Sequence, residues 1–314
     1  MKRKLLVALC SIIVWVAVGF AIFKFVIVAE GDLKYRLNED GESFSVYVDN
    51  EYEYDTWNRE KNVVIPSTYK GKPVTALYNG TFQSSETVIS VTIPDSVTKI
   101  GYYCFTRCSS LESVSIPDTI IEVGTGFEES PLLKFNEYDN ALYLGNEKNP
   151  YVVLVKAVDK EITRCEIHPD TKAIAADAFK DCIWLKKITI PDNVRSIGNY
   201  AFADCTSLEE LTYGEGLVII CGHAFYGCEK LNSVSFLGYL KGADCKLSRI
   251  DGSAFSNCHS LECIVIPASV ESMESGVFGN CPAKIYCEAE SQPIGWDQNW
   301  AGYTADVVWN FSNK

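Results

Sequence analysis

Cysteine and histidine are the side chains of this protein that could perform nucleophilic or metal chemistry. The sequence holds 13 cysteines and three histidines, at positions His168, His223 and His259. One group could in principle supply four tetrahedral zinc ligands, namely Cys221, His223, Cys228 and Cys245. Their spacing is irregular and the chain contains no Cys-x-x-Cys pair. The sequence therefore favours a protein without a metal site and without a cofactor.

Six of the cysteines share one position, three residues after a recurring phenylalanine. These are Cys108, Cys182, Cys205, Cys228, Cys258 and Cys281. Free cysteine behaves as a small hydrophobic side chain and is among the most buried residue types. The regular spacing therefore predicts a structural ladder of stacked, buried thiols. Disulfides stay open as an alternative outside the cytoplasm, with Cys104 and Cys108, or Cys258 and Cys263, as the pairs to test.

Charge and motif content exclude several function classes. The chain has 28 basic and 41 acidic residues, a net charge of −13, so it lacks the basic surface that nucleic-acid binding normally requires. It contains no His-Glu-x-x-His, Gly-x-Ser-x-Gly or Gly-x-x-x-x-Gly-Lys motif. We therefore expect a protein that is not an enzyme and has no nucleic-acid partner.

A repeat of about 23 residues dominates the chain. Its phenylalanines are Phe82, Phe105, Phe127, Phe179, Phe202, Phe225, Phe255 and Phe278, which mark eight copies. One unit reads Leu-x-x-Ile-x-Ile-Pro-x-x-Val-x-x-Ile-(x)4-Phe-x-x-Cys. The alternating apolar residues predict a short strand, and the proline ends it. A unit this small cannot bury its own apolar side, so neighbouring units must stack around a shared core.

The repeat resembles the BspA-like class of leucine-rich repeats. The segments that carry the resemblance are residues 91–101, 188–194 and 200–205, and the repeated pattern extends over about residues 62–287. The resemblance implies a repeat solenoid that is rich in β-structure, right-handed and joined by short turns. It also implies a surface or secreted protein of bacteria or protists, a class in which several members adhere to host matrix proteins or to other cells.

The amino terminus predicts a membrane-spanning helix. Three basic residues, Lys2, Arg3 and Lys4, precede an uncharged run of 19 residues that begins at Leu5 and ends at Phe23. As a helix this run spans roughly 28 Å, enough to cross the bilayer. The basic cluster predicts that the amino end stays in the cytoplasm and the repeats lie outside. The run is longer than the core of an ordinary signal peptide, so a retained anchor is favoured over a cleaved signal and a secreted product.

The expected organisation of the chain has five segments. Residues 1–4 form the cytoplasmic tip, 5–29 the signal anchor, 30–62 an amino-terminal β cap, 63–287 the solenoid, and 288–314 a tryptophan-rich cap. A 29-residue insertion lengthens the repeat between Phe127 and Phe179. Its two strand-like runs predict a protruding hairpin at about residues 136–161, with Glu147 and Lys148 at the tip.

The outward positions of the repeat strands predict a binding surface. They read Ser90, Thr92, Ser113, Ser115, Lys187, Thr189, Glu210, Thr212, Ser233 and Ser235. This surface is small and rich in hydroxyls, and it lacks the Trp, Tyr and Arg side chains that dominate tight interfaces. We therefore expect weak, multivalent binding of a protein or cell-surface ligand, as in an adhesin. The alternative is a structural or assembly role within the cell's own envelope.

Overall fold

Two kinds of strand alternate along the repeats. Longer strands carry the alternating apolar residues of the repeats: β3 (Lys61–Val64), β6 (Val88–Thr92), β8 (Ser113–Ser115), β14 (Lys187–Ile190), β16 (Glu210–Tyr213), β18 (Ser233–Phe236), β20 (Cys263–Ile266) and β22 (Lys284–Cys287). Two-residue strands lie further along the repeats: β7 (Lys99–Ile100), β9 (Glu122–Val123), β13 (Ala173–Ile174), β15 (Ser196–Ile197), β17 (Ile219–Ile220), β19 (Arg249–Ile250) and β21 (Ser272–Met273). A coil of the repeat thus contributes its longer strand to one sheet and its two-residue strand to another.

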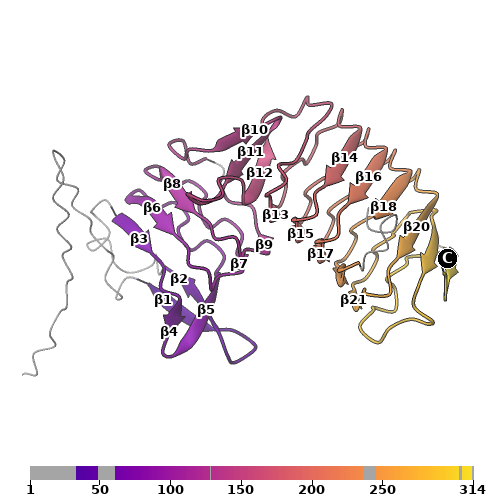
Figure 1. Ribbon diagram of the computed structural model, residues 1–314, viewed down its shortest axis with the longest axis horizontal. Coiled ribbons are helices and arrows are strands. Elements are labelled where there is room, and N and C mark those ends of the chain that lie inside the picture. The colour runs from indigo at the N-terminus through magenta and orange to yellow at the C-terminus, as the bar shows by residue number, and fades with distance from the viewer. Residues whose placement is uncertain (1–32, 49–60, 128, 237–244, 304–305, 313–314) are drawn as a thin grey trace, which may run out of the picture.

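The coils stack into a curved β-solenoid (Figure 1). The computed structural model describes residues 33–48, 61–127, 129–236, 245–303 and 306–312. Longer strands lie on the outer side of the arc, and the two-residue strands lie on its concave side (Figure 1). Corresponding strands of neighbouring coils pair in parallel, as β14 does with β16 and β16 with β18. The expected repeat solenoid is therefore present.

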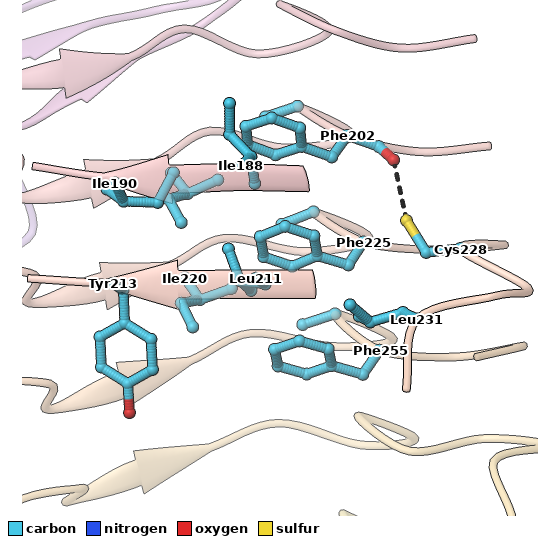
Figure 2. Packing of buried hydrophobic residues seen from close by; sticks show 14 of the residues in the cluster. Ile188, Ile190, Phe202, Leu211, Tyr213, Ile220, Phe225, Cys228, Leu231 and Phe255 are labelled. Carbon is cyan, nitrogen blue, oxygen red and sulfur yellow. Dashed lines mark hydrogen bonds between the residues drawn. The ribbon is translucent and has the colours of Figure 1, made fainter. Parts of the chain in front are cut away.

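Stacked phenylalanines form the centre of the core. Neighbouring rings lie nearly parallel, with centroids 4.9 Å apart for Phe179 and Phe202 and 5.1 Å apart for Phe202 and Phe225. Figure 2 shows this stack with the strand side chains Ile188, Ile190 and Leu211 beside it. All eight ladder phenylalanines are at most 4% exposed. The phenylalanine position of each repeat therefore lies inside the solenoid, in the hydrophobic core.

The insertion joins the solenoid instead of protruding from it. It forms β10 (Asn136–Tyr138), β11 (Ala141–Leu144) and β12 (Val153–Ala157). Strand β12 pairs antiparallel with β11 and parallel with β13, so it joins the insertion to the eight-stranded sheet that runs from β10 to β21. The two strand-like runs form the expected antiparallel pair, β11 and β12. The pair does not protrude, because the other edge of β12 pairs with β13 of the next coil. Alternating residues predict a strand but do not specify all of its partners.

The insertion also interrupts the concave side. Before it, β1 (Lys34–Leu37), β2 (Phe44–Tyr47), β5 (Lys72–Leu77), β7 and β9 form one sheet, with β4 (Thr68–Tyr69) beside β5. After it, a separate sheet runs from β10 to β21. The amide of Ala176 donates to the carbonyl of Val123 across the break, at 3.1 Å. The solenoid therefore has a front half and a rear half, with residue 127 ending the front and residue 173 beginning the rear.

Both ends of the described chain are covered. The antiparallel pair β1 and β2 lies beside β5, at the front edge of the concave sheet. At the rear, β23 (Asp306–Val308) pairs with β22. Trp296 and Trp300 are buried there, and the ring of Trp300 meets that of Phe278 edge to face at 6.1 Å. The last phenylalanine of the stack is therefore shielded by tryptophan.

The predicted membrane anchor lies outside the described residues, since residues 1–32 are not among them. Within the ranges that the structure does describe, no helix has the length and apolarity needed to cross a bilayer.

Candidate binding surfaces

The six repeat cysteines lie in the interior. Cys108, Cys182, Cys205, Cys228, Cys258 and Cys281 are all 0% exposed. Burial raises the pKa of Cys108 and of Cys182 to about 11, and it raises the pKa of Cys228 well above its ordinary value. The thiolate is the nucleophilic form of cysteine. These thiols are therefore packing groups of low reactivity.

The ladder thiols also have a hydrogen-bonding role that the sequence did not reveal. The Cys108 thiol donates to the carbonyl of Phe82 at 3.0 Å, and the Cys205 thiol donates to that of Phe179 at 3.1 Å. Cys228 repeats the contact with the carbonyl of Phe202 at 3.2 Å (Figure 2). Each of these three thiols thus reaches one coil back, where it is a second donor to a carbonyl that already accepts the backbone amide three residues further on.

The candidate zinc ligands do not converge. No group of three or more metal-binding side chains occurs in the described part of the chain. Cys228 belongs to the buried ladder, and the ring of His223 stacks on Tyr200 with centroids 4.5 Å apart. Burial lowers the pKa of His223 and raises that of Cys221 to about 12. The four residues therefore serve separate packing contacts.

The alternative disulfide pairs are not formed. All twelve cysteines of the described ranges are free thiols. Cys104 donates to the carbonyl of Tyr78 at 3.1 Å, whereas Cys108 donates to that of Phe82. Cys258 is buried and Cys263 is exposed on the outer side of β20. The two thiols of each pair therefore lie in different environments and are not bonded to each other.

The predicted hydroxyl surface lies on the outer strands. Parallel register aligns Thr189 with Thr212 and Thr212 with Ser235. In the front half it aligns Ser90 with Ser113 and Thr92 with Ser115. The ten side chains are exposed or half-buried. Residues chosen by repeat position thus form continuous rows across neighbouring coils.

Two of these rows have internal contacts. Lys187 and Glu210 form an ion pair, with Nζ and Oε2 2.6 Å apart. The Ser90 hydroxyl donates to Oδ1 of Asn62 at 2.6 Å, which extends the front row by one coil. The rows are therefore nearly neutral and present hydroxyl groups as their main binding chemistry.

The predicted hairpin tip is exposed but tied down beside it. Glu147 and Lys148 are exposed. The side-chain oxygen of Asn146 accepts the amides of Lys148 and Asn149, each at 3.0 Å, and its amide nitrogen donates to the carbonyl of Ile116 at 2.9 Å. The tip is thus an ordered turn against the front half of the solenoid.

A cavity of about 330 Å³ lies on the concave side and was not predicted. Its lining comes from front coils and rear coils together, with Lys99, Tyr102 and Glu122 facing Asn199, Arg249 and Asp251. The side-chain amide of Asn199 donates to the hydroxyl of Tyr102 across it. Burial raises the pKa of Tyr102 to about 12.

Ion pairs organise the charges of this cavity. Glu122 lies 3.0 Å from Nζ of Lys99 and 3.2 Å from Nη2 of Arg249. Nε of Arg249 lies 3.0 Å from Oδ1 of Asp251. Burial acts to raise the pKa of Glu122, but Lys99 and Arg249 outweigh it and the pKa is lowered. For Asp251 burial prevails over Arg249, and the pKa is raised.

This charged cluster could hardly be predicted from the sequence. Glu122 and Arg249 are 127 residues apart and occupy polar positions of two-residue strands. A spacing pattern within one repeat cannot pair residues that meet only after the whole chain bends. The one local signal is a charged residue at the start of three such strands, Lys99, Glu122 and Arg249.

The chain is similar to several proteins of known structure. No curated protein matches the chain. Among solved structures, the leucine-rich repeat protein of T. pallidum is 20% identical over 74% of this chain and 90% of its own, with a TM-score of 0.35. A leucine-rich repeat protein of Bacteroides ovatus is 24% identical over 91% of this chain and 71% of its own, with a TM-score of 0.33. The pneumococcal vaccine antigen PcpA is 16% identical over 91% and 98%, with a TM-score of 0.37.

Family membership rests on the repeats themselves. The model of the BspA type leucine-rich repeat region matches six copies, over residues 56–147 and 159–286. Residues 148–158, between the two matched segments, contain β12, and the segments include the longer strands from β3 to β20. With its outer rows, buried thiol ladder and curved stack of coils, the chain belongs to the family of BspA type leucine-rich repeat proteins.

Proposed function

We propose that this protein is a non-enzymatic binding protein, displayed outside the cytoplasm, that attaches to a protein or cell-surface ligand in the manner of an adhesin. One observation carries the proposal. The ladder thiols lie inside the solenoid, whereas hydroxyl side chains form rows on its surface over neighbouring coils. This arrangement supports repeated surface contacts as the chemistry of the protein.

The expected location rests on the sequence of the amino terminus. The basic residues before the apolar run that begins at Leu5 favour export of everything that follows. Members of the BspA-like class are typically surface or secreted proteins, which supports the same location. An anchored protein would hold its solenoid at the outer side of the membrane.

The composition of the rows determines the expected mode of binding. Hydroxyl side chains offer donors and acceptors but little apolar area, so each contact contributes little free energy. Binding then requires many contacts at once, and effective concentration strengthens it when several copies are displayed together. We expect a polar ligand with its own repeated groups, bound weakly by one solenoid and more firmly by many.

Protease treatment of intact source cells tests the location. Lysed cells are the control, and amino-terminal sequencing identifies the mature protein. Cleavage on intact cells, with Met1 still present, supports an anchored surface protein. Protection that ends only on lysis contradicts surface display and favours a structural role within the envelope.

Binding is tested with the full chain displayed on a non-adherent host. The probes are a panel of purified extracellular-matrix proteins. One variant places Thr189→Arg and Ser235→Arg on the outer rows, and its control places Ser109→Arg and Ser260→Arg at exposed positions of the turns that follow two ladder cysteines. We expect the row variant to lose adhesion and the control to retain it. Equal adhesion of both variants would exclude the rows as the binding surface.

A further inference from the structure

The two halves of the solenoid are joined across the concave side by polar contacts between distant residues. Nη1 of Arg195 donates to the carbonyl of Asp118 at 2.7 Å. The Ser196 hydroxyl donates to the carbonyl of Ile121. Nη2 of Arg249 contacts Oε1 of Glu122 at 3.2 Å. Each contact links a coil before the insertion to a coil after it, where the β-ladder between the sheets is interrupted.

The insertion lies at the apex of the arc. Figure 1 shows β11 and β12 there, between the front and rear coils. Strand β12 pairs with β13, while β9 forms the last strand of the front sheet. The front sheet, which ends at β9, and the rear sheet, which contains β12 and β13, therefore meet at the insertion. The junction is held on the concave side by the backbone hydrogen bond from Ala176 to Val123 and by the side-chain contacts given above.

The ion pair is the contact most sensitive to conditions. The side chains of Glu122 and Arg249 are 25% and 35% exposed, so water and salt reach both. The other charged groups of the cluster are Lys99 on β7, Asp251 after β19 and Glu274 after β21. Three carboxylates face two cations in the cavity, so its net charge is negative even with both cations in place. Loss of either cation would make it more negative. Loss of Arg249 would place Glu122, Asp251 and Glu274 together without their main counter-charge.

We propose that Glu122 and Arg249 form an electrostatic clasp that holds the bend of the solenoid, so that ionic strength sets the width of the concave cavity. The clasp closes at low salt, because the ion pair then gains most from its Coulomb attraction. It opens at high salt, because the Debye length falls from about 10 Å at 0.1 M to about 3 Å at 1 M. The inference concerns the shape of the molecule and does not depend on the ligand that the protein binds.

The distance between the two ends of the arc tests the clasp. The full chain in detergent carries a donor and an acceptor dye at azide-bearing residues that replace the exposed Val64 and Ile294. Single-molecule energy transfer then reports whether the arc opens. The variants are Glu122→Gln, Arg249→Gln and the two combined. The control variant, Lys187→Gln with Glu210→Gln, removes an ion pair between neighbouring coils of one outer sheet.

We expect lower transfer efficiency in Glu122→Gln and in Arg249→Gln, and no further loss in the combined variant, because both changes remove one shared interaction. Wild-type efficiency should fall as salt rises, and this response should be absent from the variants. The control should match the wild type in both respects. Circular dichroism verifies that each variant keeps its β-structure.

Three outcomes would overturn the clasp. These are a wild-type efficiency that does not change with salt, single variants that match the wild type, or a control that shifts as far as they do. The salt titration of the wild type keeps the test decisive even where a variant fails to fold.

Discussion

The thiols of the ladder show how one residue type can serve packing and hydrogen bonding together. Cysteine is small enough to lie between stacked phenylalanine coils, and its S–H partners the carbonyl of the preceding coil. Serine would also donate, but it would bring a more strongly hydrated hydroxyl into an apolar core. Alanine would pack without serving the carbonyl. Cysteine satisfies both demands at this position.

Thiol labelling measures the accessibility of these residues. We expect Cys263, which is exposed, to react with a maleimide within minutes at neutral pH. The ladder thiols, such as Cys228, should react at least 100-fold more slowly, because burial excludes the reagent and disfavours the thiolate. Mass spectrometry of the labelled peptides distinguishes the sites. The control is the same chain unfolded in concentrated guanidinium, where all the thiols should react at similar rates. Labelling of the ladder thiols at the rate of Cys263 in the folded chain would contradict the buried ladder.

Alkaline pH should destabilise the fold. The ladder cysteines have an ordinary pKa of 9.0, raised by burial to about 11 for Cys108 and Cys182. The unfolded chain therefore loses thiol protons at lower pH than the folded chain. The thiols cause no loss of stability below pH 9, and the free energy of unfolding falls as pH rises from there towards 11.

Urea unfolding across this range measures the decline in the free energy of unfolding. Cys228→Ala should be less stable at neutral pH but should show a shallower decline. Cys263→Ala is the control and should keep the wild-type slope. A slope that does not change in Cys228→Ala would remove the buried thiols as its cause.

At the scale of single coils, the phenylalanine stack should dominate stability. Phe225 is 0% exposed between Phe202 and Phe255, whose ring centroids lie 5.1 and 5.2 Å from its own. We expect Phe225→Ala to lower the free energy of unfolding by about 3–5 kcal/mol, through lost burial and a cavity. Trp184→Ala is the matched control, since Trp184 is 54% exposed. Denaturant unfolding measures both, and equal losses would contradict a stack-centred core.

Seven of the eight phenylalanine turns place a residue in the left-handed backbone region both two positions before and two positions after the phenylalanine, and the turn of Phe127 does so only after it. Around Phe179 these are Asp177 and Asp181, with φ of 57° and 62°. Asp181→Val should destabilise by about 1–2 kcal/mol, because a β-branched residue is strained there. Asp181→Gly should cost less than Asp181→Val. Thermal unfolding compares the two, and a valine variant as stable as the glycine variant would contradict the strain.

The elements were largely predictable, and their partners were less so. Alternation and proline in segments such as Ile188 to Pro191 specify a strand and its end locally. The insertion carries the same alternation, yet β12 pairs with a coil that begins about 20 residues later, at β13. Glu122 and Arg249 come into contact only because the solenoid curves and brings β9 close to β19. Local patterns therefore predict the coil, and long-range geometry decides the cavity.

At the scale of the whole molecule, the core divides at the insertion. One apolar cluster contains Phe82, Phe105 and Phe127, and the other contains the phenylalanines from Phe179 onward. We expect two unfolding transitions by calorimetry. Phe105→Ala should lower the front transition and leave the rear one unchanged, and Phe225→Ala should do the opposite. A single transition that both variants shift equally would show that the clasp and the insertion couple the halves into one unit.

The in-register stacking of the coils has a mechanical consequence. Tension along the solenoid axis loads the backbone hydrogen bonds of the end coil first, so coils detach in succession instead of all resisting together. A coil of about 23 residues occupies about 4.8 Å of the stack and extends to roughly 80 Å when pulled out. A chain pulled from both ends would therefore lengthen many times over, coil by coil, instead of resisting until the whole fold fails at once.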